Sequence, residues 1–124
     1  MARILLIDDD DQVRTVLYLA LANAGHTVVE ARDGKEGLAL FGLSPVDLVI
    51  TDIVMPEKEG LEVLMRLLKK HPSVKIIAIS GGGGLRNGAY YLRTAKLLGA
   101  AKVIEKPFSS DVLLAAVDEL LPKP

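Results

Sequence analysis

Apolar residues along the chain fall into five short runs, and each run is followed by a segment in which apolar positions recur every three or four residues. The runs are too short for helices, and the β-branched residues of the central runs are typical of strands covered on both faces. The spacing of three or four residues predicts helices. We expect strands over residues 4–7, 27–31, 46–51, 74–79 and 102–104, and helices over about 11–24, 35–41, 61–70, 87–98 and 110–121.

This alternation of strands and helices predicts the α/β class. A strand that is followed by a helix and then by another strand builds a parallel sheet, with helices packed on both of its faces. The expected architecture therefore has three layers, with a doubly wound, five-stranded parallel sheet between two layers of helices. No linker, repeat or low-complexity tract interrupts the pattern, so residues 1–124 are interpreted as one domain.

Local signals mark the ends of several expected helices. Asp10 or Asp11 is the expected N-cap of the first helix, and Ser109 or Ser110 that of the last, because short polar side chains accept hydrogen bonds from the free amides there. The helical spacing also assigns apolar residues to the inward-facing side of their helices, among them Val16, Met65 and Val112.

The overall charge is close to neutral, with 15 basic and 16 acidic residues and a net charge of −1. This balance provides no electrostatic basis for binding nucleic acid or an anionic membrane. The chain has no cysteine, which excludes disulfides and thiolate metal sites. No apolar stretch approaches the roughly 18 residues of a membrane-spanning helix, and the N-terminus lacks the long apolar region of a signal peptide. A cytoplasmic location is therefore the expectation.

Polar side chains stand where four of the expected strands end. Asp8 and Asp9 follow the first strand, Asp52 follows the third, Ser80 follows the fourth, and Lys106 comes just after the fifth. The carboxyl ends of parallel strands share one edge of the sheet, and ligands of open α/β sheets bind outside that edge. One polar residue at a strand end is common, but three carboxylates, a hydroxyl and a lysine together indicate a functional site.

The charges in this set favour phosphoryl transfer. Two carboxylates about 4 Å apart repel each other by roughly 4 kcal/mol at an effective dielectric constant of 20, so three of them need a counter-charge. Oxygen ligands without histidine or cysteine select a hard cation such as Mg²⁺. Lys106 and Ser80 add a positive charge and a hydroxyl that suit a phosphate. The residues therefore predict transfer of a phosphoryl group to Asp52, giving an aspartyl phosphate.

The motifs in this order resemble the receiver domain of response regulators in two-component signal transduction, over the whole stretch from Ile4 to Leu121. The resemblance implies a CheY-like, flavodoxin-like fold with the strand order 2-1-3-4-5. The matching pieces are Ile4-Leu5-Leu6-Ile7-Asp8-Asp9, the Asp52 segment through Met55-Pro56, Gly60-Leu61, Ile79-Ser80, Gly99-Ala100 and Lys106-Pro107-Phe108.

The resemblance also implies roles for individual residues. Asp52 is the expected acceptor of a phosphoryl group from a phosphohistidine on a sensor histidine kinase or a phosphotransfer protein. Mg²⁺ is expected at Asp9 directly, at Asp8 mostly through water, at Asp52, and at the carbonyl of Val54. Lys106 and Ser80 are expected to contact the phosphoryl group. Such a domain is a signalling switch, and its catalysis is limited to its own phosphorylation and dephosphorylation.

Two departures from the family concern how a signal leaves the site. Val103 stands where many receivers have an aromatic residue, and four glycines at 81–84 follow Ser80. We expect an order–disorder switch across about 81–91 in place of an aromatic relay. A downstream protein is expected to bind the face made by the helix at 87–98, the strand at 102–104 and the last helix.

Several alternative functions remain open from the residues alone. The chain could be a phosphorelay intermediate, or a fragment of a larger regulator that carries an effector domain. A phosphatase of the haloacid-dehalogenase type also uses an aspartate nucleophile, but it needs a second aspartate two residues later, where this chain has Val54. A flavin-binding module of the same topology is disfavoured, because the carboxylates would repel the flavin phosphate.

Overall fold

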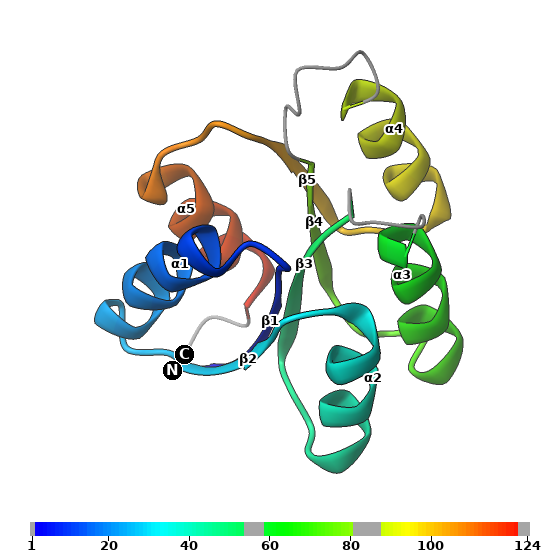
Figure 1. The fold of residues 1–124 in the computed structure, drawn as a ribbon, viewed down its shortest axis with the longest axis horizontal. Coiled ribbons are helices and arrows are strands. Elements are labelled where there is room, and N and C mark those ends of the chain that lie inside the picture. The colour runs from blue at the N-terminus through cyan, green and yellow to red at the C-terminus, as the bar shows by residue number, and fades with distance from the viewer. Residues whose placement is uncertain (1, 54–58, 81–87, 122–124) are drawn as a thin grey trace.

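The structure is a computed structural model that describes residues 2–53, 59–80 and 88–121. Strands and helices alternate along the described chain (Figure 1). Val54, the glycines at 81–84 and the side chains of Tyr90 and Tyr91 lie outside the described residues, so expectations about them stay predictions. The elements are β1 (Arg3–Ile7), α1 (Asp11–Asn23), β2 (Thr27–Ala31), α2 (Gly34–Leu43), β3 (Leu48–Asp52), α3 (Glu59–Lys70), β4 (Ile76–Ser80), α4 (Gly88–Leu98), β5 (Lys102–Glu105) and α5 (Ser110–Leu120).

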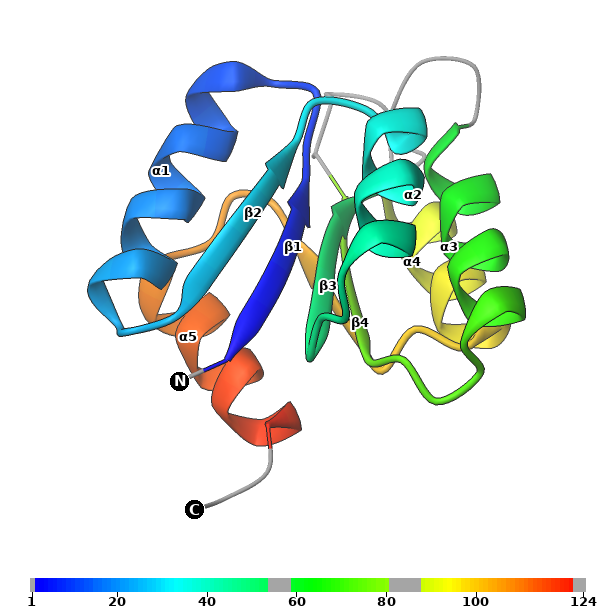
Figure 2. The same cartoon turned by 90° about the horizontal axis from the view of Figure 1, so that it is seen from below.

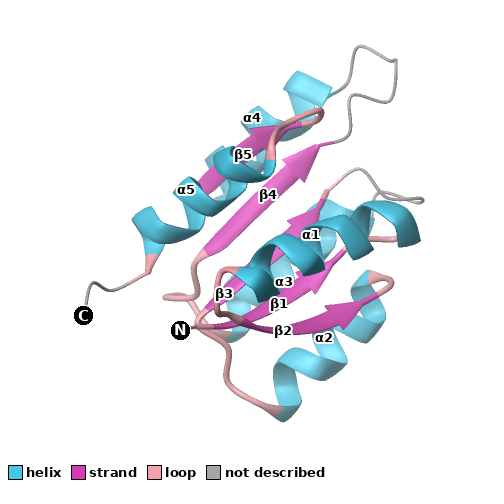
Figure 3. Ribbon diagram, turned by 90° about the vertical axis from the view of Figure 1, so that its left-hand side faces the viewer, coloured by secondary structure: helices cyan, strands magenta, loops and turns pink. Residues whose placement is uncertain are grey.

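The described strands form one parallel sheet in the order β2-β1-β3-β4-β5, which confirms the predicted strand order. All of the arrows in Figure 3 run in the same direction, so their carboxyl ends meet at one edge. Ile7 pairs with Thr51, Asp52 pairs with Ile79, and Ser80 pairs with Glu105. This register brings the polar residues at the ends of β1, β3 and β4 to neighbouring positions.

Two layers of helices cover the sheet. Helices α1 and α5 lie on one face, and α2, α3 and α4 lie on the other (Figures 1 and 2). Alternate residues of β1 point to opposite faces, as strand geometry requires. Leu5 and Ile7 join the apolar cluster beneath α2, α3 and α4, whereas Ile4 and Leu6 join the cluster beneath α1 and α5. The three-layer architecture predicted from the alternation is therefore confirmed.

Local interactions mark the helix ends as expected. The Asp10 side chain caps α1 by accepting hydrogen bonds from the amides of Gln12 and Val13, at 2.9 and 3.1 Å. Ser109 caps α5 in the same way. Gly99 follows α4 with a φ of 121°, a left-handed conformation that favours glycine and allows the chain to turn toward β5.

Two predictions about the elements are wrong in detail. Strands β3 and β4 begin and end later than expected, so Asp52 and Ser80 are the last residues of their strands rather than the first residues after them. Val16, Met65 and Val112 were expected to face the core but are 62%, 52% and 49% exposed. A helix buries only a stripe of its surface, and better-placed neighbours occupy that stripe in each case. Among the described residues, no helix is long and apolar enough to cross a membrane.

Candidate functional site

Three carboxylates meet at the carboxyl edge of the sheet. Asp8 follows β1 and is buried, Asp52 ends β3 and is buried, and Asp9 is exposed. One carboxylate oxygen from each residue lies within 4.8 Å of the other two. The Asp8 amide donates a hydrogen bond to the carbonyl of Ala31 at 3.1 Å, which ties the backbone of Asp8 to the end of β2. The convergence expected from the strand ends is present in the fold.

Lys106 provides the positive charge at this cluster. Its Nζ lies 3.3 Å from Oδ2 of Asp52 and 3.4 Å from Oδ2 of Asp8, and its side chain is only 19% exposed. The Lys106 amide donates to the carbonyl of Ser80 at 2.9 Å, which anchors the segment after β5 to the end of β4. Burial lowers the pKa of Lys106, but the charges of Asp52 and Asp8 raise it by more, so the pKa stays above the ordinary lysine value. The ammonium is therefore charged at neutral pH.

Asp8 sits in the most buried part of the site. Burial raises the pKa of its carboxyl group, and this effect exceeds the lowering by the Asp10 amide and by Lys106; the nearby Asp9 charge raises the pKa further. The Asp10 amide donates to Oδ1 of Asp8 at 2.9 Å, which fixes the orientation of the carboxylate. The ionised form of Asp8 thus carries a free-energy cost that a further cation would relieve.

Ser80 is fully buried at the end of β4, one residue beyond the partner of Asp52 in the β3–β4 register. Its position matches the expected hydroxyl at the same edge as Asp52. Val54, the expected source of a carbonyl ligand, lies outside the described residues. Asp10 and Asp11 follow Asp9 in sequence, but they serve the start of α1: Asp10 caps the helix and Asp11 pairs with Arg14.

The donor set of the cluster fits a hard divalent cation. It consists of carboxylate oxygens close enough to share one ion, with no nitrogen or sulfur ligand among the three side chains. Mg²⁺ is bound in proteins through one or two carboxylates together with waters and phosphate oxygens. The chemistry of the ligands and the excess of negative charge suit that ion, and among the described residues only the Lys106 ammonium pairs with these carboxylates.

Comparison with known proteins identifies the family. The family model described as the response regulator receiver domain matches residues 4–118. The chain belongs to the response-regulator receiver family. The receiver is 33% identical over 121 residues to the response regulator receiver protein CpdR of Brucella abortus, and the match covers 98% of each chain. It also resembles the crystal structure of the receiver domain of NtrX from Brucella abortus, with a TM-score of 0.87, 32% identity, and coverage of 95% of this chain and 97% of that one.

Other relatives of the receiver are much longer proteins. The transcriptional regulatory protein GlrR of Escherichia coli is 32% identical over 120 residues, a match that covers 97% of this chain but 26% of GlrR. The chain thus spans about a quarter of the length of that relative. The fold and family are shared, whereas the activities of the longer proteins belong to those proteins.

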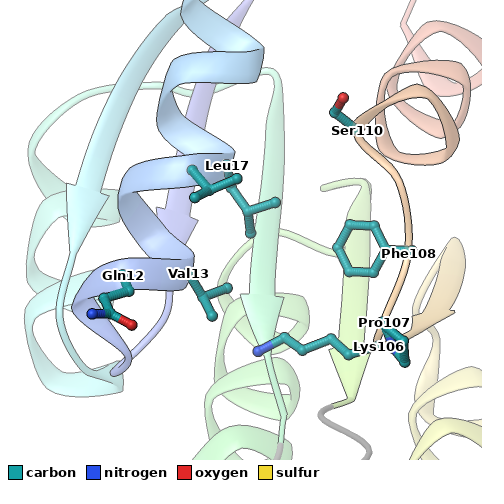
Figure 4. Close-up of a pocket in the computed structure, with 8 residues that line it drawn as sticks. Gln12, Val13, Leu17, Lys106, Pro107, Phe108 and Ser110 are labelled. Atoms are coloured by element: carbon teal, nitrogen blue, oxygen red, sulfur yellow. The ribbon is translucent and has the colours of Figure 1, made fainter.

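An apolar hollow of about 340 Å³ adjoins the carboxylate site of the receiver (Figure 4). In Figure 4, Val13 and Leu17 on α1 face Phe108 across the hollow, and the Lys106 side chain extends along one end of it. Val16, which is largely exposed, also lines this hollow. Sequence reasoning assigned Val16 to the core, because helical spacing cannot distinguish a core-facing position from the wall of a surface hollow.

Sequence reasoning also missed Arg14, which lies on α1 and contacts the backbone next to the carboxylates of the receiver. Its Nη1 donates to the carbonyl oxygen of Asp8 at 2.8 Å. The same guanidinium pairs with Asp11 and with Glu30 on β2. Its side chain is 11% exposed. A positive residue one turn after an acidic run was the available signal, but only the fold reveals that it contacts the backbone of Asp8.

Proposed function

We propose that the receiver accepts a phosphoryl group on Asp52 from a phosphohistidine of a sensor histidine kinase or a phosphotransfer protein. The observation that carries this proposal is the position of the Asp52 carboxylate. It is buried at the end of β3, 3.3 Å from the Lys106 ammonium and within 4.8 Å of oxygens from Asp8 and Asp9. An acceptor between an ammonium and an acidic, cation-binding pair suits the transfer of a highly charged group.

The neighbouring residues have distinct roles in this proposal. Asp8, Asp9, Asp52 and the carbonyl of Val54 would hold Mg²⁺, which would supply positive charge to offset that of the phosphoryl oxygens. An Asp52 oxygen attacks the phosphorus atom, the bond from phosphorus to the donor's imidazole nitrogen breaks, and the electron pair returns to that nitrogen. Lys106 binds a phosphoryl oxygen, and Ser80 donates a hydrogen bond to another once the group is in place.

Asp52 is a better acceptor than either of the other two carboxylates. Oδ1 of Asp8 already accepts a hydrogen bond from the Asp10 amide, and Asp8 is the most buried of the three residues. Asp9 is exposed, and the ion pairs that Lys106 makes with described residues involve Asp8 and Asp52 rather than Asp9. This arrangement supports Asp8 and Asp9 as cation ligands and Asp52 as the nucleophile.

The apolar hollow offers the phosphohistidine donor a docking surface beside the acceptor. Val13, Val16 and Phe108 line it, and Lys106 connects it to Asp52. We expect apolar side chains of the donor to fill the hollow while its histidine reaches Asp52. A different face, made by α4, β5 and α5, is the proposed surface for a downstream protein, and the 87% exposure of Leu97 on α4 supports this choice.

The proposal covers one receiver domain over residues 1–124 that acts in the cytoplasm and binds neither nucleic acid nor a membrane directly. The near-neutral charge supports the last two points. The same chemistry serves a signalling endpoint, a phosphorelay intermediate or the receiver part of a longer regulator. Apart from its own phosphorylation and dephosphorylation, no enzymatic reaction is proposed.

Labelling with a small phosphodonor tests the acceptor. Incubation with acetyl phosphate and Mg²⁺ should add one phosphoryl group to the intact protein, as measured by mass spectrometry. The Asp52→Asn variant should lose the added mass, because an amide is not a nucleophile for this transfer. Asp118→Asn, which changes an exposed carboxylate on α5, is the matched control and should be labelled like the parent protein. Undiminished labelling of Asp52→Asn would show that another residue is the acceptor.

A further inference from the structure

The Arg14 side chain connects three elements that converge behind the carboxylate site. Among the described residues, its guanidinium contacts the backbone carbonyl of Asp8 after β1, the carboxylate of Asp11 in α1, and the carboxylate of Glu30 in β2. The Nη1–O distance to Asp8 is 2.8 Å, and the Nε–Oε1 distance to Glu30 is 3.4 Å. With 11% exposure, the side chain is held in place rather than extended into solvent.

The contact between Arg14 and the carbonyl of Asp8 fixes the orientation of the peptide bond between Asp8 and Asp9. The Asp8 carbonyl belongs to the peptide unit that leads directly to Asp9. On its other side, the Asp8 amide donates to the carbonyl of Ala31. The backbone of Asp8 is therefore held at both its amide and its carbonyl, and the second contact determines the direction in which the chain leaves toward Asp9.

The charge of Arg14 has the wrong sign to attract a cation. A guanidinium near a divalent-ion site repels the ion, so a purely electrostatic role would make Mg²⁺ binding weaker in the presence of Arg14. If Arg14 instead fixes the geometry of the ligands, Mg²⁺ binding is stronger in the presence of Arg14. Outer partners that orient metal ligands commonly change metal affinity by about 10- to 100-fold when they are replaced. The two roles can therefore be separated by the direction of the change in affinity.

We propose that Arg14 is a positioning residue for the divalent-cation site: its fork of hydrogen bonds sets the Asp8–Asp9 peptide so that the two carboxylates converge with Asp52. Glu30 assists by holding the guanidinium against β2. This inference rests on the proposed Mg²⁺ site. It adds a residue that touches neither the ion nor the phosphoryl group and that acts through the backbone.

Two substitutions separate charge from geometry. Arg14→Lys keeps the positive charge but cannot contact three acceptors in one plane, and Arg14→Met keeps the apolar stem without the charge. The matched control is Arg66→Met, because Arg66 is exposed on α3 and pairs only with Glu62 among the described residues. The dissociation constant of Mg²⁺ is measured by titration, following the amide shifts of the folded protein by NMR.

The expected result is that both Arg14 variants bind Mg²⁺ about 10-fold more weakly than the parent protein, while Arg66→Met is unchanged. In Mg²⁺-free buffer, the amide of Asp10, which donates to Asp8, should exchange with solvent faster in Arg14→Lys than in the parent protein. Unchanged or tighter Mg²⁺ binding by Arg14→Lys and Arg14→Met would overturn the inference. If Arg14→Met fails to fold, the Mg²⁺ affinities of Arg14→Lys and Glu30→Gln test the inference instead. A smaller loss of Mg²⁺ affinity is expected for Glu30→Gln, because that carboxylate is partly exposed.

The parent protein separates this inference from the proposed function. If the parent does not bind Mg²⁺, the proposed cation site is wrong, and the proposed positioning role of Arg14 is wrong as well. If the parent binds Mg²⁺ and is labelled on Asp52, but the Arg14 variants bind the ion equally well, only the positioning role is wrong.

Discussion

Replacing Lys106 by methionine should destabilise the protein strongly without Mg²⁺ and much less with it. Methionine keeps most of the apolar stem but removes the ammonium that lies 3.3 Å from Asp52 and 3.4 Å from Asp8. At an effective dielectric constant of 20, each of these contacts represents roughly 5 kcal/mol of attraction. Desolvation of the lysine offsets a large part of that attraction, as it does for buried ion pairs generally.

The net loss of unfolding free energy in Lys106→Met depends on the two carboxylates that remain without their partner. Oxygens of Asp8 and Asp52 within 4.8 Å repel each other by roughly 3.5 kcal/mol at the same dielectric constant. Removing one partner of a buried pair typically costs about 3–5 kcal/mol. Because Lys106 is 19% exposed, we expect the lower value, about 3 kcal/mol of unfolding free energy at pH 7 without metal.

A bound Mg²⁺ should replace the missing counter-charge. If saturating Mg²⁺ reduces the loss to about 1.5 kcal/mol, linkage requires the variant to bind the ion about 10-fold more tightly than the parent protein. The test is urea unfolding followed by far-UV circular dichroism, in EDTA and in excess Mg²⁺. Lys102→Met removes a lysine that pairs with Glu119 away from the site, so it should cost at most about 1 kcal/mol in either buffer. Equal losses for Lys106→Met in the two buffers would refute the counter-charge reasoning.

Two further predictions concern the site and the core. Mg²⁺ at 100 times its dissociation constant should raise the unfolding free energy by about 2.7 kcal/mol, and Asp9→Ala should lose most of that gain in thermal melts. The raised pKa of Asp8 means that its stabilising contribution is complete below the ordinary aspartate pKa of about 3.9 and is lost as the pH rises through the raised value. Metal-free Asp8→Asn should therefore be more stable than the parent at pH 7, with a gain that shrinks toward pH 4; a constant gain would contradict this. Gly37→Ala should cost about 1 kcal/mol, because a Cβ there would lie 2.5 Å from Cδ1 of Ile7, whereas Gly42→Ala meets no atom within 4 Å and should be neutral or stabilising in the same denaturation assay.

The local properties of the sequence determined most of the fold class. Strand and helix segments follow from hydrophobic spacing, and the caps at Asp10 and Ser109 follow from hydrogen bonds between residues close together in the chain. The edge that carries the site was also predictable. Parallel strands place their carboxyl ends at one edge, so Asp8, Asp52 and Ser80 were expected at that edge, and the strand order β1-β3-β4 then makes them neighbours. The order of the strands came from resemblance to a family rather than from hydrophobic spacing.

Only the tertiary structure decided which apolar positions face a core and which line a surface. Val16 and Leu17 are both apolar residues that the helical spacing assigned to the inner side of α1, yet Val16 is 62% exposed at the wall of the hollow and Leu17 is buried. The sequence did not predict the contacts of Arg14 either, because they involve a backbone carbonyl six residues earlier and Glu30 in β2. Hydrophobic spacing and capping report interactions between near neighbours along the chain. Contacts between separate elements depend on how those elements pack, and that packing is specified by the whole sequence at once rather than by any one segment of it.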